Sequence, residues 1–122
     1  MPDYWLDHIH LVSSEPKKTA EFYKKMFGAI WVNTLDLGEG RVIVKLDLNG
    51  IGILVTQRMS DDGQNGLVHF GIGTDNLAKA VDDLEAEGVK FTQGIREVRP
   101  GLKISFLLAP EDVSVELQEG SI

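Results

Sequence analysis

Hydrophobic and polar positions alternate in short segments along the first half of the chain, and one helix-like segment interrupts them. This alternation predicts strands, because successive side chains of a strand point to opposite faces. After the first strand, the spacing of Tyr23, Met26 and Phe27 predicts a helix over about 16–27 with one apolar side. The predicted strands are Leu6–Val12, Ile30–Leu35, Val42–Leu48 and Ile51–Thr56.

Residues typical of helix ends and tight turns flank these segments. Ser13 and Ser14 predict an N-cap, and Pro16 suits the first helical turn. Gly28 predicts the C-terminal cap of the same helix. The Asn-Gly pair at 49–50 predicts a hairpin, because both residues tolerate the positive φ of a two-residue turn.

The second half of the chain repeats this order after a polar segment at 59–66, which we predict to be a flexible linker. A helix is predicted over about 75–87, with Leu77, Val81 and Leu84 on one face. The predicted strands are Leu67–Thr74, a segment at Phe91, Lys103–Leu108 and Val113–Gln118. Each half therefore has the order β-α-β-β-β.

The two halves align without a gap, and the alignment places His8 over His69. We therefore predict a single domain, 1–122, made of two βαβββ modules at about 5–58 and 67–119. One such module cannot cover both faces of its own sheet. Two modules together predict an α+β fold, in which a curved mixed sheet has its helices outside and a concave inner cleft.

The composition is that of a folded domain, since 43% of the 122 residues are hydrophobic and 25% are charged. No segment approaches the roughly 20 apolar residues of a membrane span. No basic segment followed by an apolar run is visible at the N-terminus, so we expect a cytoplasmic protein. Cysteine is absent, which excludes disulfides and thiolate ligands and leaves nitrogen and oxygen atoms to bind a metal.

The formal net charge of -7 changes the expected partners. A surface this acidic repels a phosphate backbone, so nucleic-acid binding is not expected. No basic patch is dense enough to predict binding to an anionic membrane. A small-molecule partner is the class that remains.

A carboxylate interrupts the apolar alternation of the last predicted strand. In the alignment of the two modules, Ile53-Leu54-Val55 falls over Val115-Glu116-Leu117. If the helix-covered face takes Val115 and Leu117, then Glu116 points into the concave side, where we also expect His8 and His69.

Two imidazoles and one carboxylate form a 2-His-1-carboxylate set. Such a set binds Fe, Mn, Ni, Co or Zn as the divalent ion and leaves coordination positions open for substrate oxygens. A single histidine in a strand is more often a structural residue. The placement of His8, His69 and Glu116 on corresponding strands of a repeat favours a metal site.

Short motifs follow one another in a particular order along nearly the whole chain. They are the opening strand with His8, Ala20-Glu-Phe-Tyr23, Phe27-Gly28, Leu67-Val-His69, and Ala109-Pro-Glu-Asp112 before Val115-Glu-Leu117. In this order and spacing the chain resembles the vicinal oxygen chelate superfamily. That superfamily includes glyoxalase I, methylmalonyl-CoA epimerase, extradiol dioxygenases and the fosfomycin and bleomycin resistance proteins.

The resemblance implies that the metal ligands are His8, His69 and Glu116. Members similar to glyoxalase I or the epimerase use a fourth ligand, Glu or Gln, on the last strand of the first module. That place falls on Leu54, which cannot bind a metal, and the nearby Gln57 has the wrong alternation. The three-ligand set instead resembles that of extradiol dioxygenases and fosfomycin-modifying enzymes.

These features favour a small metal-dependent enzyme of glyoxalase type, a lyase or isomerase that chelates two vicinal oxygens of a small substrate. Glu116 is the predicted acid-base residue, and His10, on the face of His8, is predicted to contact the substrate. Two alternatives stay open, an Fe(II)-dependent dioxygenase-type enzyme and a metal-free binding protein similar to bleomycin resistance proteins. The resemblance also implies a homodimer, with the metal held within one chain or across two.

Overall fold

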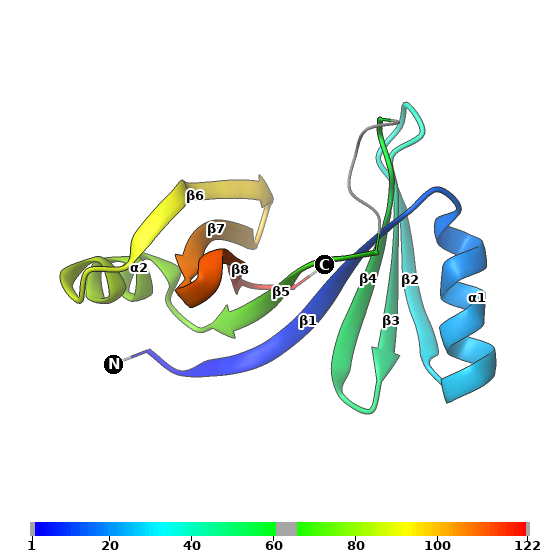
Figure 1. Ribbon diagram of the computed structural model, residues 1–122, viewed down its shortest axis with the longest axis horizontal. Coiled ribbons are helices and arrows are strands. Elements are labelled where there is room, and N and C mark those ends of the chain that lie inside the picture. The colour runs from blue at the N-terminus through cyan, green and yellow to red at the C-terminus, as the bar shows by residue number, and fades with distance from the viewer. Residues whose placement is uncertain (1, 61–65, 122) are drawn as a thin grey trace. The chain divides into compact units, whose positions relative to one another are not determined.

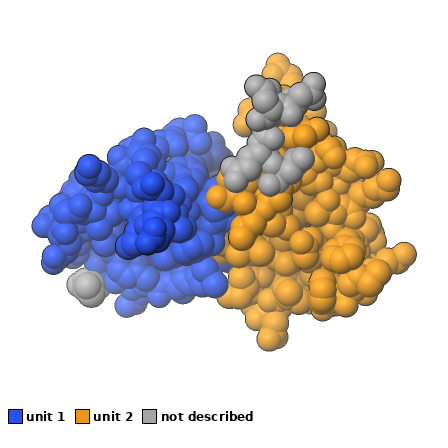
Figure 2. Space-filling view, in the orientation of Figure 1, with its two compact units in different colours: residues 1–7, 69–122 blue, residues 8–68 orange. Residues whose placement is uncertain are grey.

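The computed structural model describes residues 2–60 and 66–121, and most of the predicted linker at 59–66 lies outside these ranges. The chain divides into two compact units (Figure 2). We call residues 8–68 the N-terminal unit, and residues 1–7 with 69–122 the C-terminal unit. The first seven residues thus group with the second half of the chain, whereas the repeat placed residues 5–7 in the first module.

The N-terminal unit contains the predicted β-α-β-β-β order (Figure 1). Its elements are β1 (Tyr4–Ser13), of which residues 8–13 belong to this unit, α1 (Pro16–Phe27), β2 (Ile30–Asp36), β3 (Val42–Leu48) and β4 (Ile51–Gln57). The strand order is β2-β3-β4-β1. Hairpins make β2, β3 and β4 antiparallel, whereas β1 pairs with β4 in parallel after the long connection through α1.

The C-terminal unit repeats this arrangement. Its elements are β5 (Gly66–Thr74), α2 (Leu77–Ala86), β6 (Lys90–Arg99), β7 (Leu102–Ala109), the short 3-10 helix η1 (Pro110–Asp112) and β8 (Val113–Glu119). The strand order is β5-β8-β7-β6, again with the first and last strands parallel. The α+β class, the mixed strand directions and both βαβββ modules are therefore confirmed. Among the described residues, neither helix is long and apolar enough to cross a membrane.

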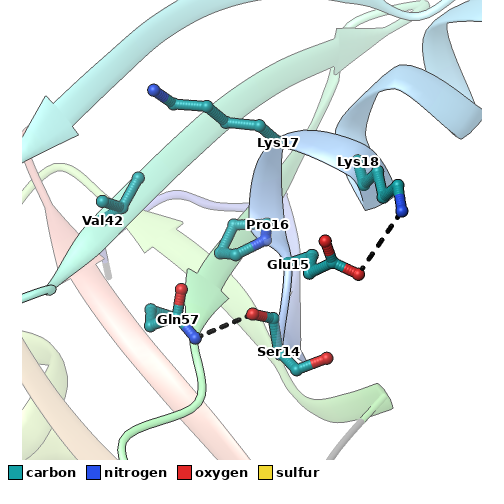
Figure 3. A pocket seen from close by; sticks show the side chains of 7 residues that line it. All are labelled: Ser14, Glu15, Pro16, Lys17, Lys18, Val42 and Gln57. Atoms are coloured by element: carbon teal, nitrogen blue, oxygen red, sulfur yellow. Dashed lines mark hydrogen bonds and ion pairs between the residues drawn. The ribbon is translucent and has the colours of Figure 1, made fainter.

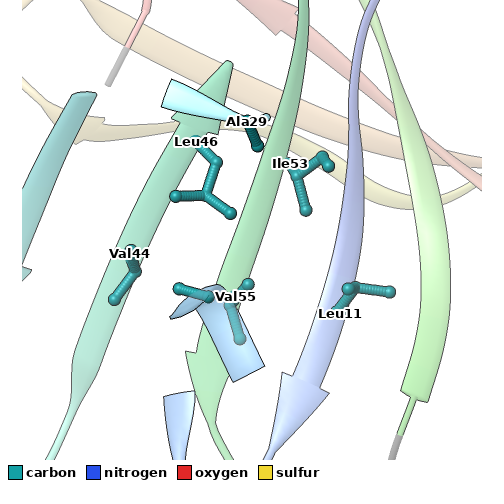
Figure 4. Close-up of a cluster of buried hydrophobic side chains, with 7 residues drawn as sticks. Leu11, Ala29, Val44, Leu46, Ile53 and Val55 are labelled. Carbon is teal, nitrogen blue, oxygen red and sulfur yellow. The ribbon is translucent and has the colours of Figure 1, made fainter. Parts of the chain in front are cut away.

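Each unit buries one face of its sheet under its helix. In the N-terminal unit, Ala20 of α1 packs with a cluster from the sheet and its flanks (Figure 4). The cluster contains Leu11, Ala29, Val44, Leu46, Ile53 and Val55. In the C-terminal unit, Leu77 and Ala80 of α2 pack with Leu107, Val115 and Leu117. The helix-covered face of β8 is thus the one that the sequence predicted.

The predicted N-cap of the first helix is wrong. Glu15 occupies the N-cap position of α1 and its side chain makes no capping hydrogen bond. The Ser13 hydroxyl instead accepts a hydrogen bond from the Glu15 amide at 3.0 Å and pairs with the Thr19 hydroxyl at 2.7 Å. Gly28 caps the helix in the left-handed conformation, as predicted.

The second helix begins later than predicted, because Asn76 ends the extended segment before it. The Asn76 side chain accepts a hydrogen bond from the Lys79 amide at 3.1 Å, which is the usual N-cap interaction. The strand at Phe91 is much longer than the sequence indicated, since β6 spans ten residues. Register shifts against β7 interrupt its alternation and hide it from a pattern of period two.

Gly73 of β5 is required by the indole ring of Trp5. A β-carbon at Gly73 would collide with that ring. We expect Gly73→Ala to displace Trp5 and to lower the free energy of unfolding by about 1–3 kcal/mol, the usual range for overpacking. Chemical denaturation followed by fluorescence of Trp5, in a Trp31→Phe background, measures both effects.

Gly94→Ala in β6 is the matched control, because a β-carbon there meets no atom within 4 Å. If both glycine variants change stability equally, backbone flexibility rather than the Trp5 contact explains the result.

Candidate metal centre

Two of the three predicted ligands lie together in the C-terminal unit. His69 is on β5 and Glu116 is on the neighbouring parallel strand β8. The His69 Nε2 atom lies 3.6 Å from the Glu116 Oε1 atom, and the two side chains are only 8% and 11% exposed. The structure therefore joins an imidazole and a carboxylate at a buried position.

Strand alternation explains why Glu116 faces away from the helix. Its neighbours Val115 and Leu117 are buried against α2, so the side chain between them points to the opposite face of the sheet. A carboxylate buried at this position has lost most of its hydration. Such a group is found where it is paired or binds a metal.

Phe106 of β7 supports the His69 ring. It is the register partner of Glu116 in the antiparallel pair of β7 and β8. The ring centroids of Phe106 and His69 are 5.1 Å apart at an interplanar angle of 84°, an edge-to-face contact. The sequence did not predict this contact between Phe106 and His69.

His8 belongs to the N-terminal unit. It lies on β1, opposite Gly52 of β4, and is only 1% exposed. Its neighbour Ile9 packs on the helix-covered core, so His8 points to the other face of its sheet. His8 thus occupies on β1 the place that His69 occupies on β5.

His10 and Leu54 lie on the same face of the N-terminal unit as His8. His10 Nε2 and the Thr56 hydroxyl are 2.8 Å apart, within hydrogen-bond distance. Leu54 of β4 is the register partner of His10 and is buried. An apolar side chain therefore occupies the place that the resemblance assigned to a fourth ligand.

Gln57 is engaged elsewhere and does not replace Leu54 as a ligand. Its amide nitrogen donates to the Ser14 carbonyl at 3.0 Å, beside a pocket of about 390 Å³ at the start of α1 (Figure 3). The Lys18 ammonium lies 3.7 Å from the Glu15 carboxylate at the same pocket. This pocket is lined by no histidine, so we do not assign the metal chemistry to it.

The atoms of His69 and Glu116 fit a divalent metal ion. Nitrogen and carboxylate oxygen are suitable donors, and each binds such an ion at about 2.0–2.2 Å. Two donors of one tetrahedral ion are therefore separated by about 3.4 Å. The observed 3.6 Å is close to that separation and longer than a normal N–H···O hydrogen bond.

Residues 5–117 match the Glyoxalase/Bleomycin resistance protein/Dioxygenase superfamily. This match covers nearly the whole chain, and the two βαβββ modules agree with it. The protein therefore belongs to this superfamily. None of the curated proteins compared with the chain matches it.

Solved structures with the same fold include a hypothetical protein from Bacillus halodurans C-125. It is 20% identical, has a TM-score of 0.82, and the match covers 98% of this chain and 96% of that one. Methylmalonyl-CoA epimerase from Mycobacterium tuberculosis is 20% identical with a TM-score of 0.77, covering 96% and 88% of the two chains.

A third structure is a single-residue variant of Streptomyces coelicolor methylmalonyl-CoA epimerase in complex with 2-nitronate-propionyl-CoA. It is 22% identical with a TM-score of 0.76, and the match covers 97% of this chain and 98% of that one. At these identities the likeness establishes the fold alone.

Proposed function

We propose that this protein is a small metal-dependent enzyme of glyoxalase type, a lyase or isomerase acting on a substrate with two vicinal oxygens. The observation that carries the proposal is the buried pair of His69 and Glu116, whose donor atoms are 3.6 Å apart. Family membership supports it as well, because the residues 5–117 that match the superfamily include every proposed ligand.

We include His8 as the third ligand. The duplication aligns it with His69, and both histidines are on the first strand of a module, facing away from its helix. The His8 side chain is buried, which suits a metal ligand. Histidine side chains without such a role are more often partly hydrated. In this proposal the three residues would make up a 2-His-1-carboxylate set for Fe, Mn, Ni, Co or Zn.

A divalent ion in this set would supply Lewis-acid polarisation of a substrate oxygen. Glu116 is the residue that we expect to accept and return the substrate proton, because its carboxylate lies in a buried site. The Phe106 ring restricts the orientation of His69, so that its Nε2 atom stays directed at Glu116. His10, whose ring lies beside the Thr56 hydroxyl, is proposed to contact the substrate.

We propose that the substrate is a small molecule other than the ligand bound in the epimerase structure. The Streptomyces coelicolor epimerase structure contains 2-nitronate-propionyl-CoA, but that protein is only 22% identical to this chain. Leu54 replaces the fourth ligand implied by the epimerase resemblance, so we propose a different substrate. By the family resemblance we propose a homodimer, and light scattering measures the oligomeric state. The cytoplasmic location expected from the sequence stays a proposal.

The test is a measurement of metal binding. Protein purified without added metal is dialysed against Fe, Mn, Ni, Co or Zn, and its metal content is determined by mass spectrometry. We expect about one ion per chain and a higher melting temperature, since binding to the folded state stabilises it. His69→Ala should lose the stoichiometric ion, because it removes one of the three proposed ligands.

His10→Gln is the matched histidine control and should keep the ion, because His10 is not a proposed ligand. Stoichiometric metal in the His69→Ala variant contradicts the proposed set. Oxygen consumption with a catechol and Fe(II) would redirect the proposal to the dioxygenase alternative. No metal uptake and no thermal shift with any of the five ions would favour the metal-free binding protein.

A further inference from the structure

A lysine lies in the middle of the N-terminal unit's sheet, on the face that carries His10. Lys45 is on β3, and its register partner on β4 is Leu54, which is also the partner of His10 on β1. His10, Leu54 and Lys45 therefore form one row across three adjacent strands. Neighbouring strands are about 4.8 Å apart, so the row spans about 10 Å from His10 to Lys45.

Packing of β3 fixes the side to which Lys45 points. Val44 and Leu46, on either side of it, are fully buried in the core under α1. The side chain of Lys45 therefore faces away from the helix, as His10 does on β1. It is half-buried rather than exposed.

Nothing in the described part of the chain neutralises this ammonium group. Lys45 takes part in none of the ion pairs among residues 2–60 and 66–121. Asp47 shares its face, but its carboxylate accepts a hydrogen bond from the Gly50 amide at 3.2 Å and so belongs to the β3–β4 turn. A half-buried lysine packs its alkyl stem against the sheet and keeps its ammonium group toward solvent, where an external anion can reach it.

A comparison of the two units shows which residue of the C-terminal unit corresponds to Lys45. In the C-terminal unit the pair corresponding to Lys45 and Leu54 is Phe106 and Glu116, which are also register partners on adjacent strands. One unit thus has a carboxylate beside an aromatic ring, and the other has a leucine beside an ammonium group. This pair of positions therefore carries a negative charge at Glu116 in one unit and a positive charge at Lys45 in the other, on different members of the pair.

A second cation lies further along the same face. Arg41 lines a cavity of about 200 Å³ together with Ile43 and Thr56, and Thr56 is the residue that contacts His10. Arg41 also forms no ion pair within the described residues. Two cations on one face, neither in an ion pair within residues 2–60 and 66–121, are a local exception to the acidity of a chain with net charge -7.

We infer that Lys45, with Arg41 beyond it, binds an anionic group of the substrate at a distance from its vicinal oxygens. This inference rests on the proposed function and deepens it, because it assigns the substrate to small hydroxy or oxo acids with a second carboxylate or similar oxyanion. The ammonium group donates charge-assisted hydrogen bonds to that oxyanion.

The experiment compares malate with lactate, two 2-hydroxy acids of which only malate has a second carboxylate. Calorimetric titration of the Mn-loaded protein should show malate binding about tenfold more tightly than lactate, the effect of one charge-assisted contact. Lys45→Met should reduce malate affinity to that of lactate and leave lactate binding unchanged. Lys45→Arg should keep most of the preference, because it keeps the charge.

Lys103→Met is the matched control, since it removes an exposed lysine from β7. Equal binding of both acids to the unaltered protein overturns the inference. So does an equal loss of malate affinity in the Lys45→Met and Lys103→Met variants, which would reflect net charge alone.

Metal content separates this inference from the proposed function. If the protein takes up no metal, the proposed function fails, and the titrations are repeated on the metal-free protein. A preference for malate that disappears in the Lys45→Met variant would still support an oxyanion site at Lys45. If the metal-free protein shows no preference either, the inference about Lys45 fails as well.

Discussion

Replacing Glu116 by leucine is expected to abolish tight metal binding without destabilising the metal-free protein. The variant removes the only proposed carboxylate ligand, and we expect metal affinity to fall by at least about 100-fold, the upper end of what loss of an outer-shell partner costs. Stability should not fall, because leucine already occupies the corresponding position 54 and replacing buried charges by apolar groups is often neutral or stabilising.

Equilibrium dialysis measures the affinity, and denaturation of the metal-free protein measures the free energy of unfolding. Glu97→Leu is the matched control, since it removes the same charge from the exposed side of β6. Metal affinity equal to that of the unaltered protein would remove Glu116 from the proposed ligand set. A large loss of stability would instead assign the carboxylate a structural role.

The second large effect is expected from Leu54→Glu, which restores a ligand where the resemblance implies one. In the metal-free protein the new carboxylate would be buried beside His10, because Leu54 is only 7% exposed. We expect the free energy of unfolding to fall by about 1–3 kcal/mol, the cost of burying a polar group without full compensation. Added metal should recover this loss by binding the folded state more tightly.

Melting temperatures with and without Mn, Ni and Zn measure the recovery. Leu54→Met is the control, because it keeps an apolar side chain of similar volume and should change neither stability nor metal response by much. A metal-induced shift no larger in Leu54→Glu than in Leu54→Met would show that position 54 is too far from the ion to bind it.

Strand alternation is the part of this fold that the sequence predicts well. Each strand buries one face under a helix, so its apolar residues recur with period two. The βαβββ repeat then predicts a mixed sheet. That pattern placed Glu116 opposite Val115 and Leu117, and the packing around α2 confirms it. The same pattern placed His10 on the face that contacts Thr56.

Features that depend on contacts between distant segments were missed. The edge-to-face contact of Phe106 with His69 depends on the order of β5, β8 and β7, which no local pattern encodes. In the sequence Lys45 is an ordinary polar residue of an alternating strand. Its position beside Leu54 depends on the register of β3 and β4. The Ser13 hydroxyl interacts with both the Glu15 amide and the Thr19 hydroxyl, whereas the residue type alone predicted a simple N-cap.

The division of the chain has a consequence for the order in which it folds. The N-terminal unit is a continuous stretch, 8–68, and can form as it leaves the ribosome. The C-terminal unit needs the first residues as well, since the Asp3 amide donates to Asp75 at 3.1 Å and Trp5 lies against Gly73. Closing that contact spans about 70 residues, a long-range step that slows folding. Trp5, made almost first, therefore lacks its contact with Gly73 until the second half of the chain has been made.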